Sequence, residues 1–183
     1  MKKITILLTT AIFASLNALE AKADSYNYKP YVGVDYVFDQ AKAFGVKPHH
    51  HSGALRVGSD YSKYFATEVF ISQSTQDKRN VGEDKLATSY LAYGLDALAF
   101  LPVGGGFSLA ATAGIGEYNY KTKFSPTNRH HEHGYGYRFG GGAKYALNDN
   151  WQTRIMCRYV NFDKMEGYDH AMEYSFGVEY HFK

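Results

Sequence analysis

Residues 172–183 read MEYSFGVEYHFK and decide what the rest of the chain is expected to be. Large apolar residues at every second position alternate with polar or small ones: Tyr174, Phe176, Val178, Tyr180 and Phe182 against Glu173, Ser175, Gly177, Glu179 and His181. Successive side chains of a β-strand point to opposite faces, so this strand has one apolar, aromatic face and one polar face. Strict alternation of this kind to the end of a chain favours a strand between lipid and a polar interior over a strand of a soluble sandwich.

The N-terminus has the features of an export signal. Lys2 and Lys3 precede an apolar run over residues 4–16, and Ala-Lys-Ala stands at 21–23. The apolar run is too short to cross a bilayer, so we expect residues 1–23 to be a cleaved signal peptide and residues 24–183 to form one domain. Cleavage would leave 17 basic and 17 acidic residues. No basic stripe remains, so nothing favours a nucleic-acid partner.

Eight segments of the remaining chain alternate in this way, near 29–38, 52–61, 64–74, 87–101, 106–120, 134–147, 151–162 and 172–182. Short links rich in turn residues (62–63, 102–105, 148–150) alternate with long polar ones (39–51, 75–86, 121–133, 163–171). Short turns on one side and long loops on the other are typical of membrane barrels. The sequence therefore predicts an all-β fold, an eight-stranded antiparallel up-and-down transmembrane β-barrel in the cell outer membrane, with both termini periplasmic.

Charged residues fall on the polar face of the expected strands. They are Asp35, Arg56, Asp60, Glu68, Asp96, Arg138, Lys144, Arg154, Arg158, Glu173 and Glu179. An Arg or Lys facing lipid at mid-membrane costs about 2–4 kcal/mol, which favours the register that turns all of these residues inward. Six acids and five bases would then pair in the lumen. An eight-stranded barrel is just wide enough for its own side chains, so we expect a plugged lumen rather than a catalytic or proton-relay site.

Three motifs carry a resemblance to a known family: YVGVDY at 31–36, YRFGGGAKYAL at 137–147 and EYSFGVEYHF at 173–182. Through them the chain resembles the OmpA-like and opacity-like surface barrels of Gram-negative bacteria. The resemblance implies a non-enzymatic scaffold whose four outer loops serve adhesion, host or environmental interaction, or envelope stability. It also implies outer-membrane lipid, lipopolysaccharide and the barrel assembly machinery as partners, the last through the C-terminal strand.

Two other functions stay open. Lipid A-modifying barrel enzymes place a His with a Ser and an acid at the outer rim, and His50, His51 and Ser52 are the nearest candidates here. The spacing of the sequence places no acid beside them, so no catalytic residue is assigned. The other alternative is a narrow pore for small solutes.

The histidines suggest a metal site. His49, His50 and His51 lie in the first expected outer loop, and His130, His131 and His133 lie with Glu132 in the third. Imidazole and carboxylate bind zinc, copper or nickel, so these loops could hold such an ion across the barrel mouth; no other cofactor is expected. The same histidines could instead sense pH, or be ordinary solvated loop residues.

Overall fold

The computed structural model describes residues 28–43, 49–81, 84–124, 128–163, 165 and 168–182. The expected signal peptide, residues 1–23, lies outside the described residues. The described strands are β1 (Lys29–Ala43), β2 (His49–Ser62), β3 (Phe65–Ser74), β4 (Asp77–Val81), β5 (Asp84–Gly104), β6 (Phe107–Phe124), β7 (Asn128–Ala146), β8 (Trp151–Asp163) and β9 (Tyr168–His181). No helix among the described residues is long and apolar enough to cross a membrane.

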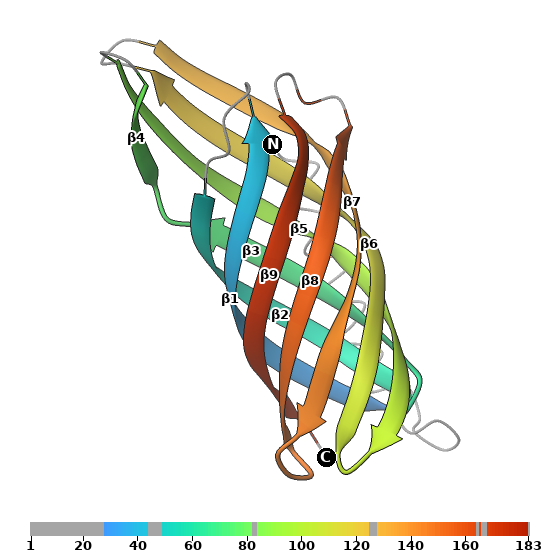
Figure 1. The fold of residues 1–183 in the computed structure, drawn as a ribbon. Coiled ribbons are helices and arrows are strands. Elements are labelled where there is room, and N and C mark those ends of the chain that lie inside the picture. The colour runs from blue at the N-terminus through green and yellow to red at the C-terminus, as the bar shows by residue number, and fades with distance from the viewer. Residues whose placement is uncertain are drawn as a thin grey trace.

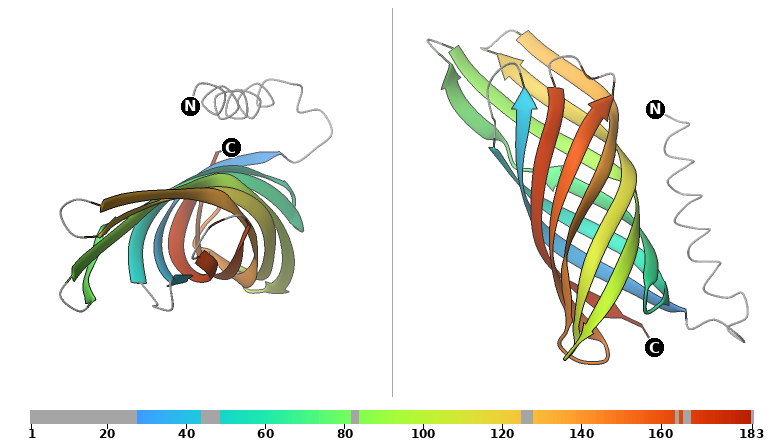
Figure 2. Two further views of the ribbon diagram at one scale, coloured as in Figure 1. Left: turned by 90° about the horizontal axis from the view of Figure 1, so that it is seen from above. Right: turned by 45° about the vertical axis from the view of Figure 1, so that its right-hand side comes forward.

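The strands close on themselves. They pair in the order β3-β2-β1-β9-β8-β7-β6-β5-β4, and β3 also pairs with β5. Because β3 and β4 follow one another and both pair with β5, they occupy a single position, interrupted at Thr75 and Gln76. The fold is therefore the predicted eight-stranded antiparallel up-and-down β-barrel, with strands strongly tilted in Figure 1 and wrapped around an interior in Figure 2.

The strand expected at residues 172–182 is part of β9 (Tyr168–His181) and closes the barrel as the alternation indicates. β9 pairs with β1 on one side, with Val178 opposite Val34, and with β8 on the other, with Phe176 opposite Ile155. Phe176 is 57% exposed on the exterior, whereas Glu173 is buried inside. One strand thus provides both the apolar exterior and the charged interior that the fold requires.

The two ends of the barrel differ. At one end, called the turn end, short connections join β2 to β3, β5 to β6 and β7 to β8. Gly104, Gly105 and Gly106 form the second of these turns with φ of 98°, 60° and 82°, the left-handed region that glycine adopts without strain. The opposite end, called the loop end, holds the connections from β1 to β2, β4 to β5, β6 to β7 and β8 to β9.

The long loops predicted for the loop end are wrong in extent. β1 continues to Ala43, β2 begins at His49, β6 continues to Phe124 and β7 begins at Asn128. These polar segments stay in the sheet because backbone hydrogen bonds between neighbouring strands do not depend on the side chains. Alternating hydropathy stops where the lipid-facing surface stops, so it does not detect the strand residues beyond that level.

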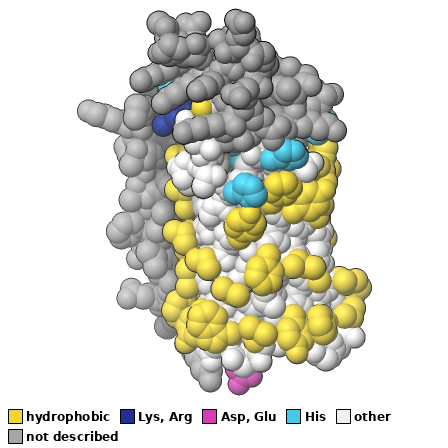
Figure 3. All heavy atoms as spheres, turned by 60° about the vertical axis from the view of Figure 1, so that its left-hand side comes forward, with side chains coloured by type: hydrophobic (Ala, Val, Ile, Leu, Met, Phe, Trp, Pro, Cys, Tyr) yellow, Lys and Arg dark blue, Asp and Glu magenta, His cyan; other side chains and the backbone are white. Residues whose placement is uncertain are grey.

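The exterior is an apolar belt. Val34, Leu55, Leu95, Ile155 and Phe176 have exposed fractions between 49% and 57%. Figure 3 shows apolar side chains gathered over one face, while the charged side chains visible there lie toward its ends. Such a surface is unfavourable in water and suited to lipid.

The interior is packed closely enough to require glycine at particular positions. A Cβ built on Gly177 would overlap the carboxylate of Asp35, and one built on Gly33 would lie 2.6 Å from the guanidinium of Arg56. Because glycine has no side chain, Gly177 on β9 leaves room for Asp35 on β1, and Gly33 on β1 leaves room for Arg56 on β2.

Candidate functional site

The centre of the lumen is a network of two arginines and three carboxylates. Arg56 lies 2.7 Å from Asp35 and 2.9 Å from Glu179. Arg154 lies 2.8 Å from Glu68 and 3.1 Å from Asp35, so Asp35 bridges the two guanidinium groups. All five side chains are buried, and burial with paired, hydrogen-bonded charges is the arrangement that a low-dielectric interior tolerates.

A second layer lies toward the loop end. Arg138 is 3.2 Å from Asp96 and 3.3 Å from Glu173, and its guanidinium stacks over the ring of Phe70 at 3.7 Å. Arg158 is held less closely. Its nearest carboxylates, Asp96 and Glu68, are 3.7 Å and 3.9 Å away, although its Nη1 donates to the hydroxyl of Ser175 at 3.1 Å.

A third layer lies toward the turn end. Lys144 is 2.9 Å from Glu179 and 3.6 Å from Asp60. His181 Nε2 lies 3.0 Å from Asp60, a contact that the alternation of side chains does not predict. Tyr31 donates from its hydroxyl to Glu68 at 2.8 Å and so ties this layer to the centre. The structure thus places all eleven charged residues that the alternation turned inward on the lumen side of the barrel.

These side chains fill the lumen. One cavity among the described residues lies between Arg56, Glu68, Arg138 and Arg158 and has a volume of about 10 Å³. That volume holds about one water molecule. At this level of the described lumen, the buried and paired side chains leave room for water but not for a larger solute.

Near the loop end the lumen contains a polar cluster that sequence reasoning missed. His50, fully buried, has Nδ1 3.2 Å from Asp39 Oδ2 and Nε2 2.9 Å from the hydroxyl of Thr88. The rings of Tyr90 and Tyr120 lie against the imidazole, with centroids 5.5 Å and 6.1 Å away. The sequence indicates only that Asp39 faces inward. It stands four residues after the inward Asp35, and strand residues an even number of positions apart share a face.

The spacing of the sequence places no acid beside His50 or His51, but in the structure Asp39 lies beside His50 from β1, with its Oδ2 3.2 Å from Nδ1. The hydroxyl that meets His50 belongs to Thr88, while Ser52 donates to the Tyr90 hydroxyl at 2.8 Å. Asp39, His50 and Thr88 have exposed fractions of 1%, 0% and 4%. A carboxylate, an imidazole and a hydroxyl in line resemble a nucleophile with its base, but all three side chains are buried near the loop end of the lumen.

The candidate metal-binding histidines lie on strands rather than in loops, and they are divided between faces. His50 points into the lumen, whereas His51 lies on the exterior and hydrogen-bonds Tyr36, and His49 stacks on Phe38 with ring centroids 5.6 Å apart. On β7, His131 and His133 are both exposed, and the side chain of His130 lies outside the described ones. Among the described residues, no group of three or more His, Cys, Asp or Glu is arranged to hold a metal ion.

A closed barrel of tilted strands with an apolar exterior and an ion-paired interior defines a transmembrane β-barrel of the bacterial outer membrane. The family model described as outer membrane protein beta-barrel domain matches residues 9–182, and the chain belongs to this family. Its location is accordingly the outer membrane. A search of curated protein sequences finds no match to the chain.

Solved structures show the same fold. Neisserial surface protein A is similar with a TM-score of 0.68 at 14% identity, over 84% of this chain and 97% of that one. Ail, the attachment invasion locus protein of Yersinia pestis, crystallised with the heparin analogue sucrose octasulfate, gives 0.62 at 13% identity over 85% and 99%. The N-terminal β-barrel domain of Pseudomonas aeruginosa OprF gives 0.59 at 14% identity over 83% and 97%. At these identities the likeness concerns the fold.

Proposed function

We propose that this chain is a non-enzymatic surface protein that captures an anionic polysaccharide at its loop end, which faces the cell exterior. The termini and the turn end then face the periplasm. This orientation is supported by the short turns at one end and by both described chain ends lying there, as expected for an even strand number. The aromatic C-terminal strand is then the segment that the barrel assembly machinery would recognise.

One observation carries the proposal: part of the sheet protrudes beyond the closed barrel. β6 and β7 stay paired up to Phe124 and Asn128, whereas the pairing of β7 with β8 ends at Tyr135 and Asp163. The protruding sheet consists of β4 and of residues 84–90, 120–124 and 128–134 of β5, β6 and β7. It is visible in Figure 1, where these strands rise past the ends of β8 and β9. Among the described residues, β7 has a strand neighbour on one side only over 128–134.

The sequence of the protruding sheet is basic. It contains Lys78, Arg79, Lys85, Lys121, Lys123 and Arg129, together with His130, His131 and His133, against Asp77, Asp84 and Glu132. A concentration of positive charge attracts anionic partners and raises the rate of encounter with them. Ail, which shares the fold, has been solved with a sulfated sugar. That complex supports a sulfated or phosphorylated polysaccharide as the partner class here.

The test measures binding of the refolded chain, in lipid nanodiscs, to immobilised heparin at several salt concentrations. Lys121→Gln/Arg129→Gln removes two charges from the protruding sheet, and Lys63→Gln, in the turn between β2 and β3, is the matched control. We expect the dissociation constant to rise about tenfold or more for the double variant and to rise with salt for the wild type. Absence of salt-sensitive binding, or an equal loss in Lys63→Gln, would contradict the proposal.

Lipid A modification is the competing function. The buried positions of Asp39, His50 and Thr88 speak against it, because a lipid substrate needs access to the nucleophile. Mass spectrometry of lipid A from cells with and without the protein separates the two functions. We expect identical spectra, and a new or missing acyl chain that depends on His50 would favour the enzyme.

A further inference from the structure

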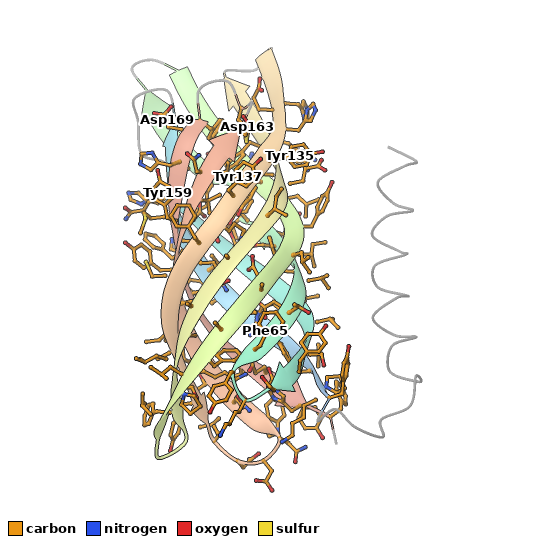
Figure 4. All side chains as sticks on the ribbon, turned by 90° about the vertical axis from the view of Figure 1, so that its right-hand side faces the viewer. Phe65, Tyr135, Tyr137, Tyr159, Asp163 and Asp169 are labelled. Carbon is orange, nitrogen blue, oxygen red and sulfur yellow. The ribbon has the colours of Figure 1, made fainter. Side chains whose placement is uncertain are left out.

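Two tyrosines stand together on the barrel exterior near the loop end. Tyr135 and Tyr137 occupy outward positions two residues apart on β7, and their exposed fractions are 53% and 49%. Figure 4 labels both of them, with Tyr159 and Asp163, toward the end of the barrel opposite Phe65. The pair therefore presents ring surface to whatever surrounds the barrel at this level.

Polar groups flank the two rings on the neighbouring strands. Tyr135 is opposite Glu117 on β6 and opposite Asp163 on β8. Tyr137 is opposite Asn161 on β8. We call these five residues the tyrosine patch. Side chains directly opposite one another in a sheet lie close enough to contact a single ligand together.

The level of the tyrosine patch along the barrel can be read from its neighbours. Ile115, opposite Tyr137, is 43% exposed, and Leu95, opposite Ile115, is 51% exposed. These aliphatic residues belong to the lipid-facing belt. One step further toward the loop end, the exterior carries the carboxylates of Glu117 and Asp163, which are unfavourable against hydrocarbon chains. The tyrosine patch thus lies where the acyl chains end and the lipid headgroups begin.

The chemistry of the tyrosine patch selects among headgroups. Two ring faces offer apolar contact to the C–H groups of a sugar, while carboxylates accept hydrogen bonds from hydroxyls and an amide both donates and accepts. Two carboxylates beside the rings repel a phosphate. A plain aromatic girdle needs the rings but not the acids and the amide that surround them here.

We propose that the tyrosine patch binds the sugar part of a glycolipid headgroup in the outer leaflet. Tyr135 and Tyr137 stack on the sugar ring, and Asn161 and Asp163 hydrogen-bond its hydroxyls. The binding requires the loop end to face the outer leaflet, as proposed above, but it is independent of polysaccharide capture by the protruding sheet. Either can therefore fail without the other.

The experiment reconstitutes the full chain in vesicles of phosphatidylethanolamine, phosphatidylglycerol and rough lipopolysaccharide, and counts the lipids retained on the protein by native mass spectrometry. Variants are Tyr135→Ala/Tyr137→Ala and Asn161→Leu, which keeps both rings. Tyr64→Ala is the control, because Tyr64 is 52% exposed but lies at the turn end. A gel shift on boiling shows that each variant is folded.

We expect the wild type and Tyr64→Ala to retain lipopolysaccharide about tenfold more than phosphatidylglycerol, and the double variant and Asn161→Leu to lose most of this preference. A second arm uses chemically dephosphorylated lipopolysaccharide, which the wild type should retain equally. Loss of retention on dephosphorylation would identify phosphate as the ligand and overturn the proposal. It is equally overturned if the variants keep the preference or if the wild type has none.

Discussion

Replacing Arg154 by leucine tests the lumen network most directly. The guanidinium donates to both oxygens of Glu68, at 2.8 Å and 2.9 Å, and to Asp35 at 3.1 Å. Hydrogen bonds between charged groups contribute about 1.5–3 kcal/mol each, so three of them give a gross loss of about 4.5–9 kcal/mol. Arg56 still contacts both carboxylates, at 2.7 Å and 3.2 Å, so neither is left alone. We therefore expect Arg154→Leu to lower the free energy of unfolding by about 3–5 kcal/mol.

Two further variants make the measurement specific. Ile155→Leu alters the next residue, which is 57% exposed on the lipid side, and should change stability by less than about 1.5 kcal/mol. Arg158→Leu should cost less than Arg154→Leu, because its carboxylates are 3.7 Å and 3.9 Å away. The assay is urea unfolding in lipid vesicles, followed by the gel mobility of folded and unfolded forms. Equal losses at 154 and 155 would show that the inward register of β8 is wrong.

Three other measurements test the packing and the ends of the barrel. Gly177→Ala should destabilise the barrel by about 1–3 kcal/mol in the same assay, since the new Cβ overlaps Asp35, while Gly53→Ala, with open space around it, should be near neutral. Planar-bilayer recordings should show no steady conductance, because the paired side chains of Arg56, Arg138 and Arg154 occupy the described lumen; a stable open state would refute the filled lumen. Calorimetric titration with zinc at pH 7.5 should show no site that needs His50 and His51 together, because His50 points into the lumen and His51 lies on the exterior; tight binding lost both in His50→Ala and in His51→Ala would reverse this expectation.

The fold was predictable because each strand has one face toward lipid and the other toward a polar lumen. In β9, Glu173 faces the lumen and Phe176 faces lipid. A shift of the pairing register by one residue would turn the carboxylate toward lipid and the ring into the lumen. The same free-energy cost of exposing charged side chains to lipid applies to every strand, so the alternation of residues in the sequence specifies the pairing register. Where lipid ends the constraint ends, and the sequence no longer showed that residues 121–124 and 128–133 continue the sheet.

The contacts within the lumen were not predictable to the same degree. Alternation says that a side chain points inward but not how high it lies along the axis. His50 meets Thr88 at a separation of 38 residues and His181 meets Asp60 at 121, and both contacts depend on the tilt of strands that are distant in sequence. The same limitation explains why Asp39 was not recognised as the partner of His50.

A filled lumen also determines where function can reside. Arg56, Arg138 and Arg154 are held by carboxylates from several strands, so a ligand entering the barrel would have to displace paired charges and leave some of them buried without partners. The exterior below the loop end is apolar and suited to acyl chains alone. Among the described residues, the loop end combines exposed polar groups with a stretch of β7, residues 128–134, that has a strand neighbour on one side only. Because the lumen is filled by paired charges and the rest of the exterior faces acyl chains, the protruding sheet and the tyrosine patch are the surfaces at which we expect binding.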